Sequence, residues 1–460
     1  MTYRLCLVSA LALASTPALA QNAPAADTAW TLQDAIGDPD NLEVSGSARV
    51  RYEALHNQFR PALDRNDDLV TLRFTLAARY DAGPVEVGAE LQDSRAYFGD
   101  TGSSVGTGEV NAFELIQAYV AADLGQPFGA GSEAKLTAGR FTMDLGSRRL
   151  VGRNNFRNAT NAFTGVRLDA KGAGGKLTAF VTMPQQRLPS DKASILDNEV
   201  EWDHEGTDLL FWGAFGSFSK LMGGADLEAY FYGLDEDDRP GVATRDRRLY
   251  TPGFRLVRAP AKGQADYELE YAHQFGSISD STAVNAPRRD VSANFAHAAL
   301  GYRFDAKWQP RVALEYDFAS GDGSGRDYGR FDSLYGPRRS DFGPTGIYGP
   351  LGRSNIHAPG VRVEAAPSRL LDGFVSYRAL WLDSASDSFA NTGVRDPSGR
   401  AGRFAGHQVE GRVRYWFVKD LLRLDSGAAV LFDGPFLRDA ANAPRSGDTL
   451  YGYVDLTATF

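Results

Sequence analysis

The stretch LEVSGSARVRYEA, at residues 42–54, carries the pattern that decides the fold. Its even-numbered residues are apolar or small, whereas its odd-numbered residues are polar or charged. Side chains of a β-strand point alternately to opposite faces of a sheet, so this period of two predicts a strand with one apolar and one polar face. The pattern returns along the chain and ends on Val454, Leu456, Ala458 and Phe460. A final alternating segment with a terminal aromatic residue is typical of a β-barrel in an outer membrane.

Eighteen segments follow this alternation, and the connections between them switch between long and short. Connections after odd-numbered segments are long, whereas those after even-numbered segments are mostly turns, such as Ala82-Gly83-Pro84. Long extracellular loops, short periplasmic turns and an even strand count define an antiparallel up-and-down transmembrane β-barrel. We expect eighteen strands, and sixteen remains possible because residues 176–182 and 208–217 carry a weak signal. The expected strands are residues 42–54, 68–81, 85–93, 112–121, 133–140, 163–170, 176–182, 208–217, 225–234, 250–258, 266–275, 291–304, 309–319, 357–365, 370–382, 406–418, 422–432 and 448–460.

The N-terminal residues predict export. Arg4 precedes an apolar run, and Ala18-Leu19-Ala20 has the small residues of a signal-peptidase site. We therefore expect a signal peptide at 1–20, a short periplasmic segment at 21–41 and a transmembrane barrel at 42–460. The only cysteine, Cys6, would leave with the signal peptide, so the mature chain would have no disulfide and no thiolate metal site. The expected location is the outer membrane of a Gram-negative bacterium, in contact with lipid and lipopolysaccharide, after delivery to the barrel assembly machinery through the C-terminal strand.

Aromatic residues near the strand ends support a membrane location. They fall on the apolar faces, where the two interfacial girdles of a membrane barrel require them. Aromatic residues also favour the strands of a soluble β-sandwich, but such a fold does not explain the signal peptide, the loop alternation and Phe460 together. These residues are Tyr52, Tyr80, Tyr271, Tyr302, Phe304, Tyr316, Phe318, Trp381, Tyr415, Phe417 and Phe432.

The polar faces predict a charged pore. In a closed barrel the last strand neighbours the first, so arginines on strands 14 to 16 and 1 to 2 would form one basic sector, with two more added by strands 5 and 6. The predicted constriction residues are Arg49, Arg51, Arg73, Arg140, Arg167, Arg362, Arg378, Arg412 and Arg414. An opposing acidic wall would contain Glu86, Glu90, Glu268, Glu270, Glu315 and Asp317. Such walls would place a transverse field across the pore, and guanidinium groups would bind carboxylates or phosphates through forked contacts. The alternative is that arginines and acids on neighbouring strands only neutralise one another.

The connection at residues 320–356 is the longest, is rich in Gly and Pro, and has no strand pattern. A loop of this length is usually functional, so we expect it to act as a lid or constriction element. Its arginines are Arg326, Arg330, Arg338, Arg339 and Arg353.

The sequence gives no sign of an enzyme or a cofactor. Its six histidines are scattered, and Ser217–Lys220 has the S-x-x-K spacing of a nucleophile without the companion motifs. Acidic runs at 235–238 and 321–327 could hold calcium among loop oxygens, but they lack the spacing of a calcium-binding loop, which favours solvated turns. Removal of Arg4 changes the formal charge from -9 to -10, which argues against a nucleic-acid partner.

Several stretches resemble the alginate export family of outer-membrane proteins. They are SGSARVRYEALHNQF at 45–59, GAELQDSRAY at 88–97, Gly139-Arg140 leading to RRLVG at 148–152, FTGVRL at 163–168, and FDSLYGPRRSDFGPTGIYGP at 331–350. The resemblance implies an eighteen-stranded monomeric channel whose arginine-rich constriction passes an anionic polysaccharide outward. It also implies that Arg140 and Arg167 match two pore arginines of the family.

These features predict a passive diffusion channel with an anion-selective pore. The permeant would be an acidic polysaccharide such as alginate, or alternatively small anions such as organic or aromatic carboxylates that are taken up. An outer-membrane hydrolase or adhesin would need a catalytic cluster or a large loop domain, and neither is visible in the sequence. The direction of transport cannot be read from the residues, because a diffusion channel follows the gradient of its permeant.

Overall fold

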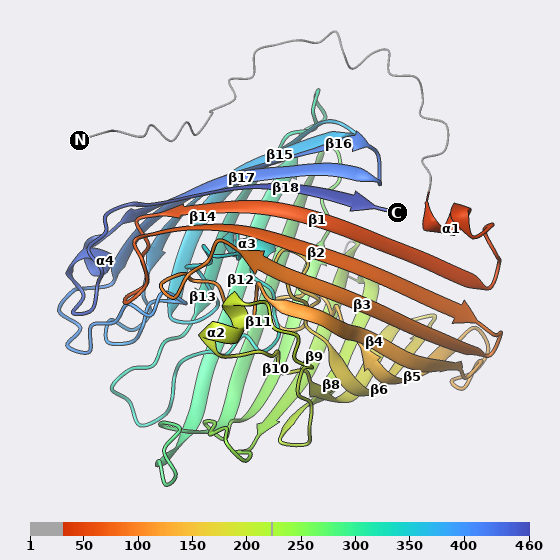
Figure 1. Cartoon of the computed structure of the whole chain (residues 1–460), viewed down its shortest axis with the longest axis horizontal. Helices are drawn as coiled ribbons and strands as arrows, with labels where there is room; N and C mark the ends of the chain where they lie inside the picture. Colours follow the sequence, from red (N-terminus) through yellow and green to blue (C-terminus); the bar gives the residue numbers. More distant parts are fainter. Residues whose placement is uncertain (1–30, 222–223) are drawn as a thin grey trace.

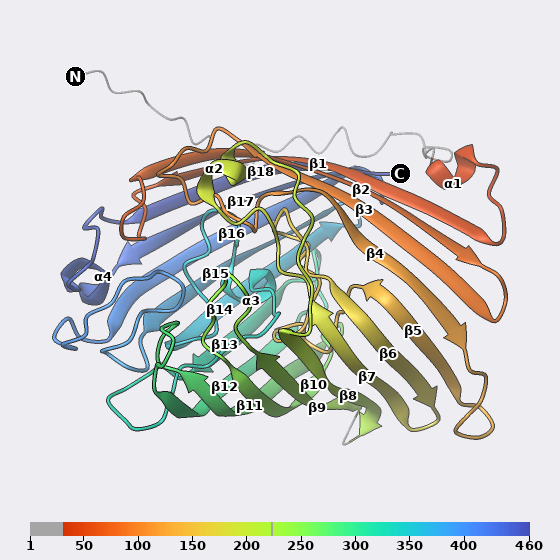
Figure 2. The same ribbon diagram turned by 60° about the horizontal axis from the view of Figure 1, so that its bottom comes forward.

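The chain forms a closed antiparallel β-barrel, in which each strand pairs with its neighbours in the sequence. The computed structural model describes residues 31–221 and 224–460. The predicted signal peptide, and the part of the 21–41 segment that precedes residue 31, lie outside the described residues. Figures 1 and 2 show the tilted strands curving around a lumen. The prediction of an eighteen-stranded transmembrane barrel is confirmed, and the sixteen-stranded alternative is excluded.

The strands and helices have the following bounds. The strands are β1 (Leu42–His56), β2 (Asn66–Asp81), β3 (Val85–Tyr97), β4 (Asn111–Asp123), β5 (Glu133–Phe141), β6 (Phe163–Gly172), β7 (Gly175–Pro184), β8 (Leu209–Leu221), β9 (Ala225–Glu236), β10 (Arg248–Arg258), β11 (Gln264–Ser279), β12 (Arg288–Arg303), β13 (Arg311–Ala319), β14 (Ile356–Ser368), β15 (Leu371–Trp381), β16 (Phe404–Val418), β17 (Leu422–Asp433) and β18 (Thr449–Thr459). The helices are α1 (Leu32–Ala35), α2 (Lys192–Leu196), α3 (Arg339–Phe342) and α4 (Pro435–Asp439).

The expected strands match the observed ones closely, and the largest differences are that β3, β8 and β11 each end four residues later than expected. β3 runs to Tyr97, four residues beyond the expected end at residue 93. Asp93 and Arg95 lie on the outward-facing positions there and form an ion pair at 3.0 Å, so charged residues interrupt the apolar face. The four helices were not predicted, and each has only four or five residues. No helix in the described part of the chain is long and apolar enough to cross a membrane.

The barrel wall buries polar side chains and exposes apolar ones. In β1, Arg49, Arg51 and Glu53 are buried, whereas Val50 is 43% and Tyr52 47% exposed. This is the reverse of a soluble sheet, and it follows from the membrane, which solvates the apolar outer face as water solvates a polar one. Most of the predicted girdle aromatics are likewise exposed on the outer face.

The seam between the first and last strands closes the barrel. β1 pairs with β18 in an antiparallel ladder that runs from Ser47 opposite Thr459 to His56 opposite Leu450. The backbone of Phe460 extends this ladder, since its N–H donates to the Gly46 carbonyl at 3.0 Å and its carbonyl accepts from the Gly46 N–H at 2.8 Å. Both β1 and β18 therefore satisfy their backbone groups on each side, which a spanning sheet requires.

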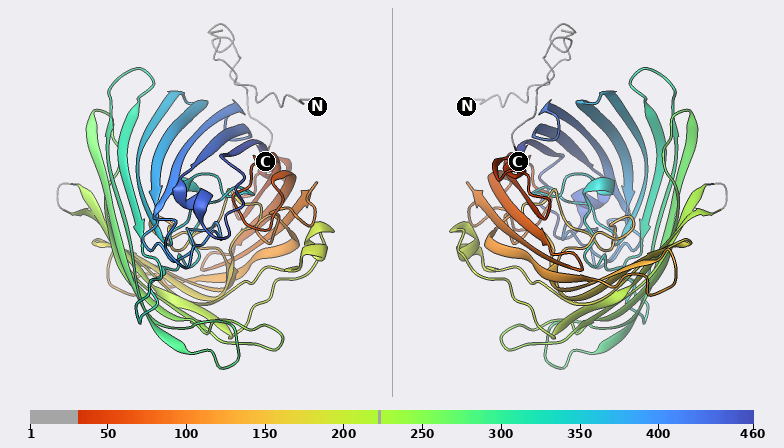
Figure 3. Two further views of the ribbon diagram at one scale, coloured as in Figure 1. Left: turned by 90° about the vertical axis from the view of Figure 1, so that its left-hand side faces the viewer. Right: turned by 90° about the vertical axis from the view of Figure 1, so that its right-hand side faces the viewer.

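Several long connections fold into the lumen. Figure 3 views the barrel from its two ends and shows loops and α3 within the ring of strands. Every residue from 341 to 356 is buried. The Ile347 N–H donates to Glu53 Oε2 at 3.0 Å, and the ring of Tyr348 stacks on Tyr451 at 5.1 Å between centroids. The predicted lid is therefore packed against the inner wall of the barrel.

An apolar core lies inside the lumen and holds the loops in place. Phe163, Phe180, Phe211 and Tyr232 project inward from β6 to β9 and contact one another at 5.1–6.1 Å between ring centroids. Tyr335, from the 320–355 connection, packs on Phe211 at 4.9 Å. Buried aromatic rings contribute strongly to packing, so this cluster anchors the connection opposite the seam.

We predict that the terminal aromatic residue is needed for closure of the seam. The Phe460 ring covers Gly46, where an added Cβ would lie 2.4 Å from the ring, and it also contacts Phe74. Deletion of Phe460, or Gly46→Val, should lower the fraction of folded protein, measured as fast-migrating protein in unboiled detergent gels. Ala48→Val, on the same outer face, should leave that fraction unchanged. Equal folding of all four proteins would contradict this account of the seam.

A pH dependence is expected for the 98–110 connection, which packs into the lumen. Burial raises the pKa of Glu109 to about 7. When this segment opens, the pKa of the carboxyl returns to its ordinary value of about 4.5. The free energy needed to open the segment should therefore be highest below about pH 4.5, decrease between about pH 4.5 and pH 7, and stay constant above that range. Hydrogen exchange of the segment should therefore accelerate over that window beyond the intrinsic rate. Glu109→Gln should abolish the change, and the same pH dependence in the variant would assign it to another group.

Candidate functional site: an arginine-lined cavity

A basic cavity lies in the lumen beside the seam. Its volume is about 310 Å3, and its walls come from β1, from β14 to β18 and from the 142–162 connection, which folds back into the barrel. Eight arginines and two aspartates line it, so the lining residues carry six more positive than negative formal charges. The charged residues are Arg49, Arg51, Arg148, Arg153, Arg362, Arg412, Arg414, Arg423, Asp425 and Asp455.

Strand register builds this cavity. Arg414 on β16 pairs with Asp425 on β17, which pairs with Asp455 on β18, which in turn pairs with Arg51 on β1. Since residues two apart share a face, Arg49 and Arg412 project beside this row. Closure of the barrel therefore brings together arginines that are more than 350 positions apart in the sequence.

The arginines of β1 and β2 are held by backbone carbonyls as well as by acids. Arg51 donates to Asp455 Oδ2 through Nε and Nη2 at 3.0 and 2.7 Å, and its guanidinium lies 3.9 Å from the centroid of Phe156. Arg49 donates to the carbonyls of Asn155 and Arg157, and Arg73 on β2 donates to the same two carbonyls. The 142–162 connection is thus fastened to the basic wall without neutralising it.

On the other side of the cavity, arginines surround one aromatic ring. Arg362 lies 3.6 Å and Arg412 5.0 Å from the centroid of Phe374. Arg362 Nε donates to Glu364 at 2.7 Å, and Arg414 Nε donates to Asp372 at 3.0 Å. The stacked geometry fixes both planar guanidinium groups while their edges remain able to donate hydrogen bonds.

Some buried Nε–H groups of these arginines have no acceptor within the described part of the chain. The Nε atoms of Arg49, Arg73 and Arg423 are buried and have no hydrogen-bond acceptor there, and Arg423 has no ion-pair partner among the described residues. A buried donor without an acceptor costs on the order of 1–3 kcal/mol. An anion at this wall would satisfy such donors, so the cavity has the chemistry of an anion site.

A second basic cavity adjoins the first. Its volume is about 270 Å3, and it shares Arg362, Phe374, Arg412 and Arg414 with the first cavity. It adds Arg303 on β12, together with the acids Glu364 and Asp372. The two cavities form one track along the inner faces of β14 to β16.

The acids of the predicted acidic wall face the lumen, and each forms an ion pair with an arginine or a lysine. Glu90 binds Arg153, Glu86 binds Lys135 at 2.9 Å, and Glu268 and Glu270 both bind Arg149. Loop arginines, which the strand pattern does not address, supply much of this compensation. On the side of β11 and β13, carboxylates still outnumber arginines. The carboxylates are Glu268, Glu270, Glu315, Asp317 and Asp341, and the arginines are Arg149, Arg255, Arg353 and Arg378.

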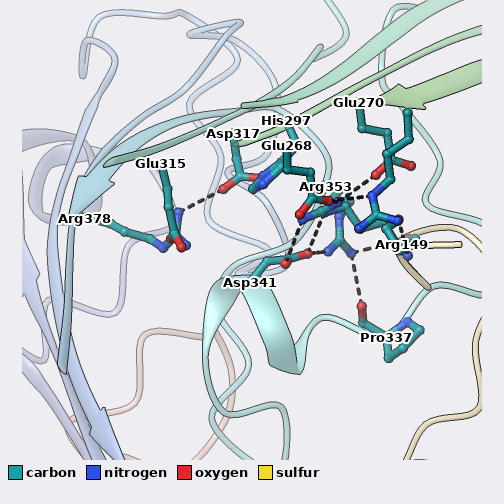
Figure 4. Close-up of polar contacts among 12 residues, drawn as sticks. Arg149, Glu268, Glu270, His297, Glu315, Asp317, Pro337, Asp341, Arg353 and Arg378 are labelled. Carbon is teal, nitrogen blue, oxygen red and sulfur yellow. Dashed lines mark hydrogen bonds and ion pairs between the residues drawn. The ribbon is translucent and has the colours of Figure 1, made fainter. Parts of the chain in front are cut away.

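Figure 4 shows the cluster of ion pairs around Asp341. Asp341 lies between Arg149, whose Nε donates to it at 3.1 Å, and Arg353. Burial alone would lower the pKa of Arg149, but the carboxylates of Glu268 and Glu270 outweigh burial and raise it. Burial lowers the pKa of Arg353 to about 9, which still leaves it charged at neutral pH.

Arg378 belongs to this cluster and not to the basic cavity. Its Nη1 donates to Asp317 Oδ2 at 2.9 Å, and Nη2 contacts Glu315. His297 Nδ1 lies 2.7 Å from the other oxygen of Asp317. The expectation that Arg378 joins the arginines of strands 14 and 16 is therefore wrong, because its side chain reaches two acids on β13.

Arg140 and Arg167 also lie outside the cavity. Arg140 Nη1 donates to Glu114 at 2.8 Å, and Arg167 Nε donates to Asp169 at 2.7 Å. The structure thus brings Arg49, Arg51, Arg362, Arg412 and Arg414 together with Arg73 beside them, and it does not place all nine predicted arginines in one constriction.

The lid arginines have different environments. Arg330 binds Asp387 at 2.8 Å, Arg353 binds Asp341, and burial lowers the pKa of Arg338 well below its usual value. Arg326 is exposed, and the side chain of Arg339 lies outside the described ones. No shared role of these arginines follows from their positions.

Sequence reasoning missed several cavity residues. Arg148 and Arg153 belong to a long connection, and a period of two says nothing about where a loop folds. Arg423 is the second residue of β17, and its inward position was available from the alternation with Asp425.

A third cavity, which we call the vestibule, lies on the side of the long connections and is larger than the basic cavity. Its volume is about 560 Å3, and Arg245, Arg247, Tyr328, Asp332 and Ser354 are among the residues that line it. It shares no lining residue with the basic cavity. Arg353, next to Ser354, donates to the carbonyl of Pro337 at 3.2 Å, and Pro337 lines the basic cavity. Arg353, which belongs to the cluster around Asp341, therefore lies between residues that line the two spaces.

Solved structures with the same fold are outer-membrane porins. Pseudomonas aeruginosa OccK8 (OprE) is 13% identical, with 91% of this chain and 98% of that chain covered and a TM-score of 0.56. A BenF-like porin from Pseudomonas fluorescens Pf-5 is 12% identical, with 92% and 99% covered and a TM-score of 0.59. Pseudomonas aeruginosa OccK2 (OpdF) in complex with glucuronate is 13% identical, with 91% and 98% covered and a TM-score of 0.56. At these identities the likeness shows the fold alone.

No curated protein matches the chain in a sequence search. The family model of alginate export matches residues 40–449, which is nearly the whole barrel. The chain therefore belongs to the alginate export family, and it is a channel-type β-barrel of the Gram-negative outer membrane.

Proposed function

We propose that the protein is an anion-selective diffusion channel whose basic cavity admits carboxylated solutes. The observation that carries this proposal is that eight arginines and two acids line a cavity of about 310 Å3, although Arg153, Arg362, Arg412 and Arg414 also pair with acids outside the lining. In a lumen walled by protein, such charges are screened less than in bulk water, so anions enter and cations are repelled. Guanidinium groups also match a carboxylate through paired hydrogen bonds.

The size of the cavity favours small permeants. A volume of about 310 Å3 is at the lower end of the range in which proteins hold small ligands. Phe374 offers an aromatic face beside Arg362 and Arg412, which suits a carboxylate attached to a ring. Uronates and aromatic carboxylates have this chemistry, and one protein of the same fold has been solved with glucuronate.

Export of an acidic polysaccharide is the second candidate, and the family match favours it. A polymer needs a continuous path, whereas the vestibule and the basic cavity share no lining residue, and the buried segment 341–356 packs in the lumen. This function therefore requires the 320–355 connection to move away from the seam.

Neutralisation of the basic cavity should reduce anion selectivity. Each charge within several ångströms of the permeant contributes on the order of 1 kcal/mol, or about fivefold. Arg362→Gln combined with Arg412→Gln should therefore lower the anion-to-cation permeability ratio at least about fivefold in planar bilayers. Arg79→Gln is the matched control, because Arg79 lies in the same lumen outside the cavity and pairs with Glu43. An unchanged ratio in the double variant would remove the assigned role of the cavity.

Shortening of the lid should enlarge the pore. Replacement of residues 343–350 by two glycines removes the segment that packs against Glu53 and Tyr451. Single-channel conductance should rise, and uronate oligomers should then block the current at concentrations that leave the intact channel open. If oligomers block the intact channel equally well, the path is already wide enough for a polymer, and the small-permeant proposal fails.

A further inference from the structure

Four arginines from four different connections lie together in the lumen without an acidic partner. We define the loop cluster as Arg60, Arg157, Arg187 and Arg338, which belong to the connections at 57–65, 142–162, 185–208 and 320–355. Each of them is partly buried, and none forms an ion pair with a residue that the structure describes. Arg149, in contrast, binds three carboxylates.

Two members of the loop cluster contact the backbone at 107–108. Arg187 Nε donates to the Thr107 carbonyl at 2.8 Å. Arg157 lies against Gly108, where an added Cβ would be 3.4 Å from Arg157 Cδ. The Ala159 N–H donates to the Gly108 carbonyl at 3.0 Å, so the 98–110 and 142–162 connections are joined here.

The other two members contact the lid at 347–349. Arg60 Nη1 donates to the Ile347 carbonyl at 2.8 Å. Arg338 Nη2 lies beside Gly349, at 3.8 Å from the position of an added Cβ. The Ser104 hydroxyl donates to the Ile347 carbonyl at 3.4 Å, so the 98–110 connection contacts both pairs of arginines or their immediate partners.

Electrostatic effects show that the four guanidinium groups are close to one another. Burial lowers the pKa of Arg60 to about 10, and it also lowers the pKa of Arg187 and Arg338. The positive charge of Arg157 contributes to each of these decreases. Repulsion between like charges weakens with distance, so Arg157 lies near the other three.

The nearby acids do not neutralise the loop cluster. Asp67 and Asp203 act on Arg60 and Arg187 but form no ion pair with them, and both carboxylates already accept hydrogen bonds from neutral groups. Burial raises the pKa of Glu109, the third acid, to about 7, so it is only partly ionised at neutral pH.

Several donors of the loop cluster remain available. The guanidinium groups of Arg157 and Arg338 have no hydrogen-bond acceptor among the described residues. Arg60 and Arg187 donate only to neutral oxygens, such as the Ile347 carbonyl and Asn161 Oδ1. Guanidinium groups bind oxyanions through paired hydrogen bonds, and an anion with two charges would also reduce the repulsion among four cations.

We propose that the loop cluster binds an inorganic dianion of the phosphate type, which fastens the four connections to one another inside the lumen. None of the four arginines lines the basic cavity. Arg157 offers its backbone carbonyl to Arg49 and Arg73 of the basic wall, at 3.1 and 3.2 Å. Binding at the loop cluster is therefore independent of the proposed anion selectivity.

Hydrogen exchange of the purified full-length barrel at pH 7.5 tests this site. Sodium phosphate would be compared with sodium chloride at equal ionic strength, after calorimetry has given the Kd for phosphate. At ten times this Kd, exchange of residues 98–110 and 343–350 should slow about tenfold, because a ligand that binds only the closed state slows opening by the factor 1 + [L]/Kd. Chloride should have little effect.

Arg157→Gln distinguishes anion binding from a structural role. The Arg157 side chain makes no hydrogen bond within the described residues, so its replacement removes repulsion without removing a contact. Exchange without phosphate should therefore slow, whereas the Kd for phosphate should rise at least about tenfold, since a lost charge-assisted hydrogen bond costs about this factor. Arg65→Gln is the matched control, because Arg65 is exposed, lies on the same connection as Arg60 and donates to Asn57 and Ser446.

Arg362→Gln combined with Arg412→Gln separates this site from the basic cavity. That double variant should lose anion selectivity but keep the response to phosphate, and unboiled gels would verify that each variant is folded. The proposal is overturned if phosphate slows exchange no more than chloride, if Arg157→Gln keeps the full response or accelerates exchange without phosphate, or if the double variant loses the response.

Discussion

A membrane-spanning sheet has to satisfy all of its backbone hydrogen bonds internally, and the rest of this structure depends on that constraint. Hydrocarbon offers no partner to an open edge, so the sheet closes on itself. β1 and β18 meet this requirement through a continuous ladder that Phe460 completes at one end. Closure then divides the side chains into an outward apolar set and an inward polar set, because successive residues of a strand point to opposite faces.

The inward set creates an electrostatic requirement inside the lumen. Charges that are partly removed from water need counter-charges or hydrogen bonds, since burial of an unpaired charge is costly. Connections that fold back into the barrel meet much of this need. Arg149 pairs with Glu268 and Glu270, and Arg153 pairs with Glu90. The cavity beside the seam is lined by eight arginines and two acids, which makes that sector the candidate permeation surface.

Much of this organisation could be predicted from the alternation of apolar and polar residues along each strand. The alternation at 42–54 predicted β1, and the rule that the last strand neighbours the first placed Arg49 and Arg51 with Arg362, Arg412 and Arg414. The girdle aromatics were predicted for the same reason, because the period of two decides which face a residue occupies.

The failures have a common physical origin in contacts that no local pattern encodes. Arg378 faces inward as expected, but its long side chain reaches Asp317 and Glu315, two strands away. Arg148 and Arg149 lie in a connection whose path depends on packing of Tyr335 and its aromatic neighbours. Strand periodicity predicts which charges enter the lumen, whereas loop packing decides which of them remain uncompensated.

The central claim is that the arginine-lined cavity makes this barrel anion-selective. The most direct measurement is the reversal potential of the unmodified protein in a planar bilayer that separates concentrated from dilute potassium chloride. The arginine excess predicts a potential with the sign of chloride diffusion, whose magnitude decreases as the ionic strength rises and screening increases. A potential with the sign of potassium diffusion, or no potential at all, would contradict the account.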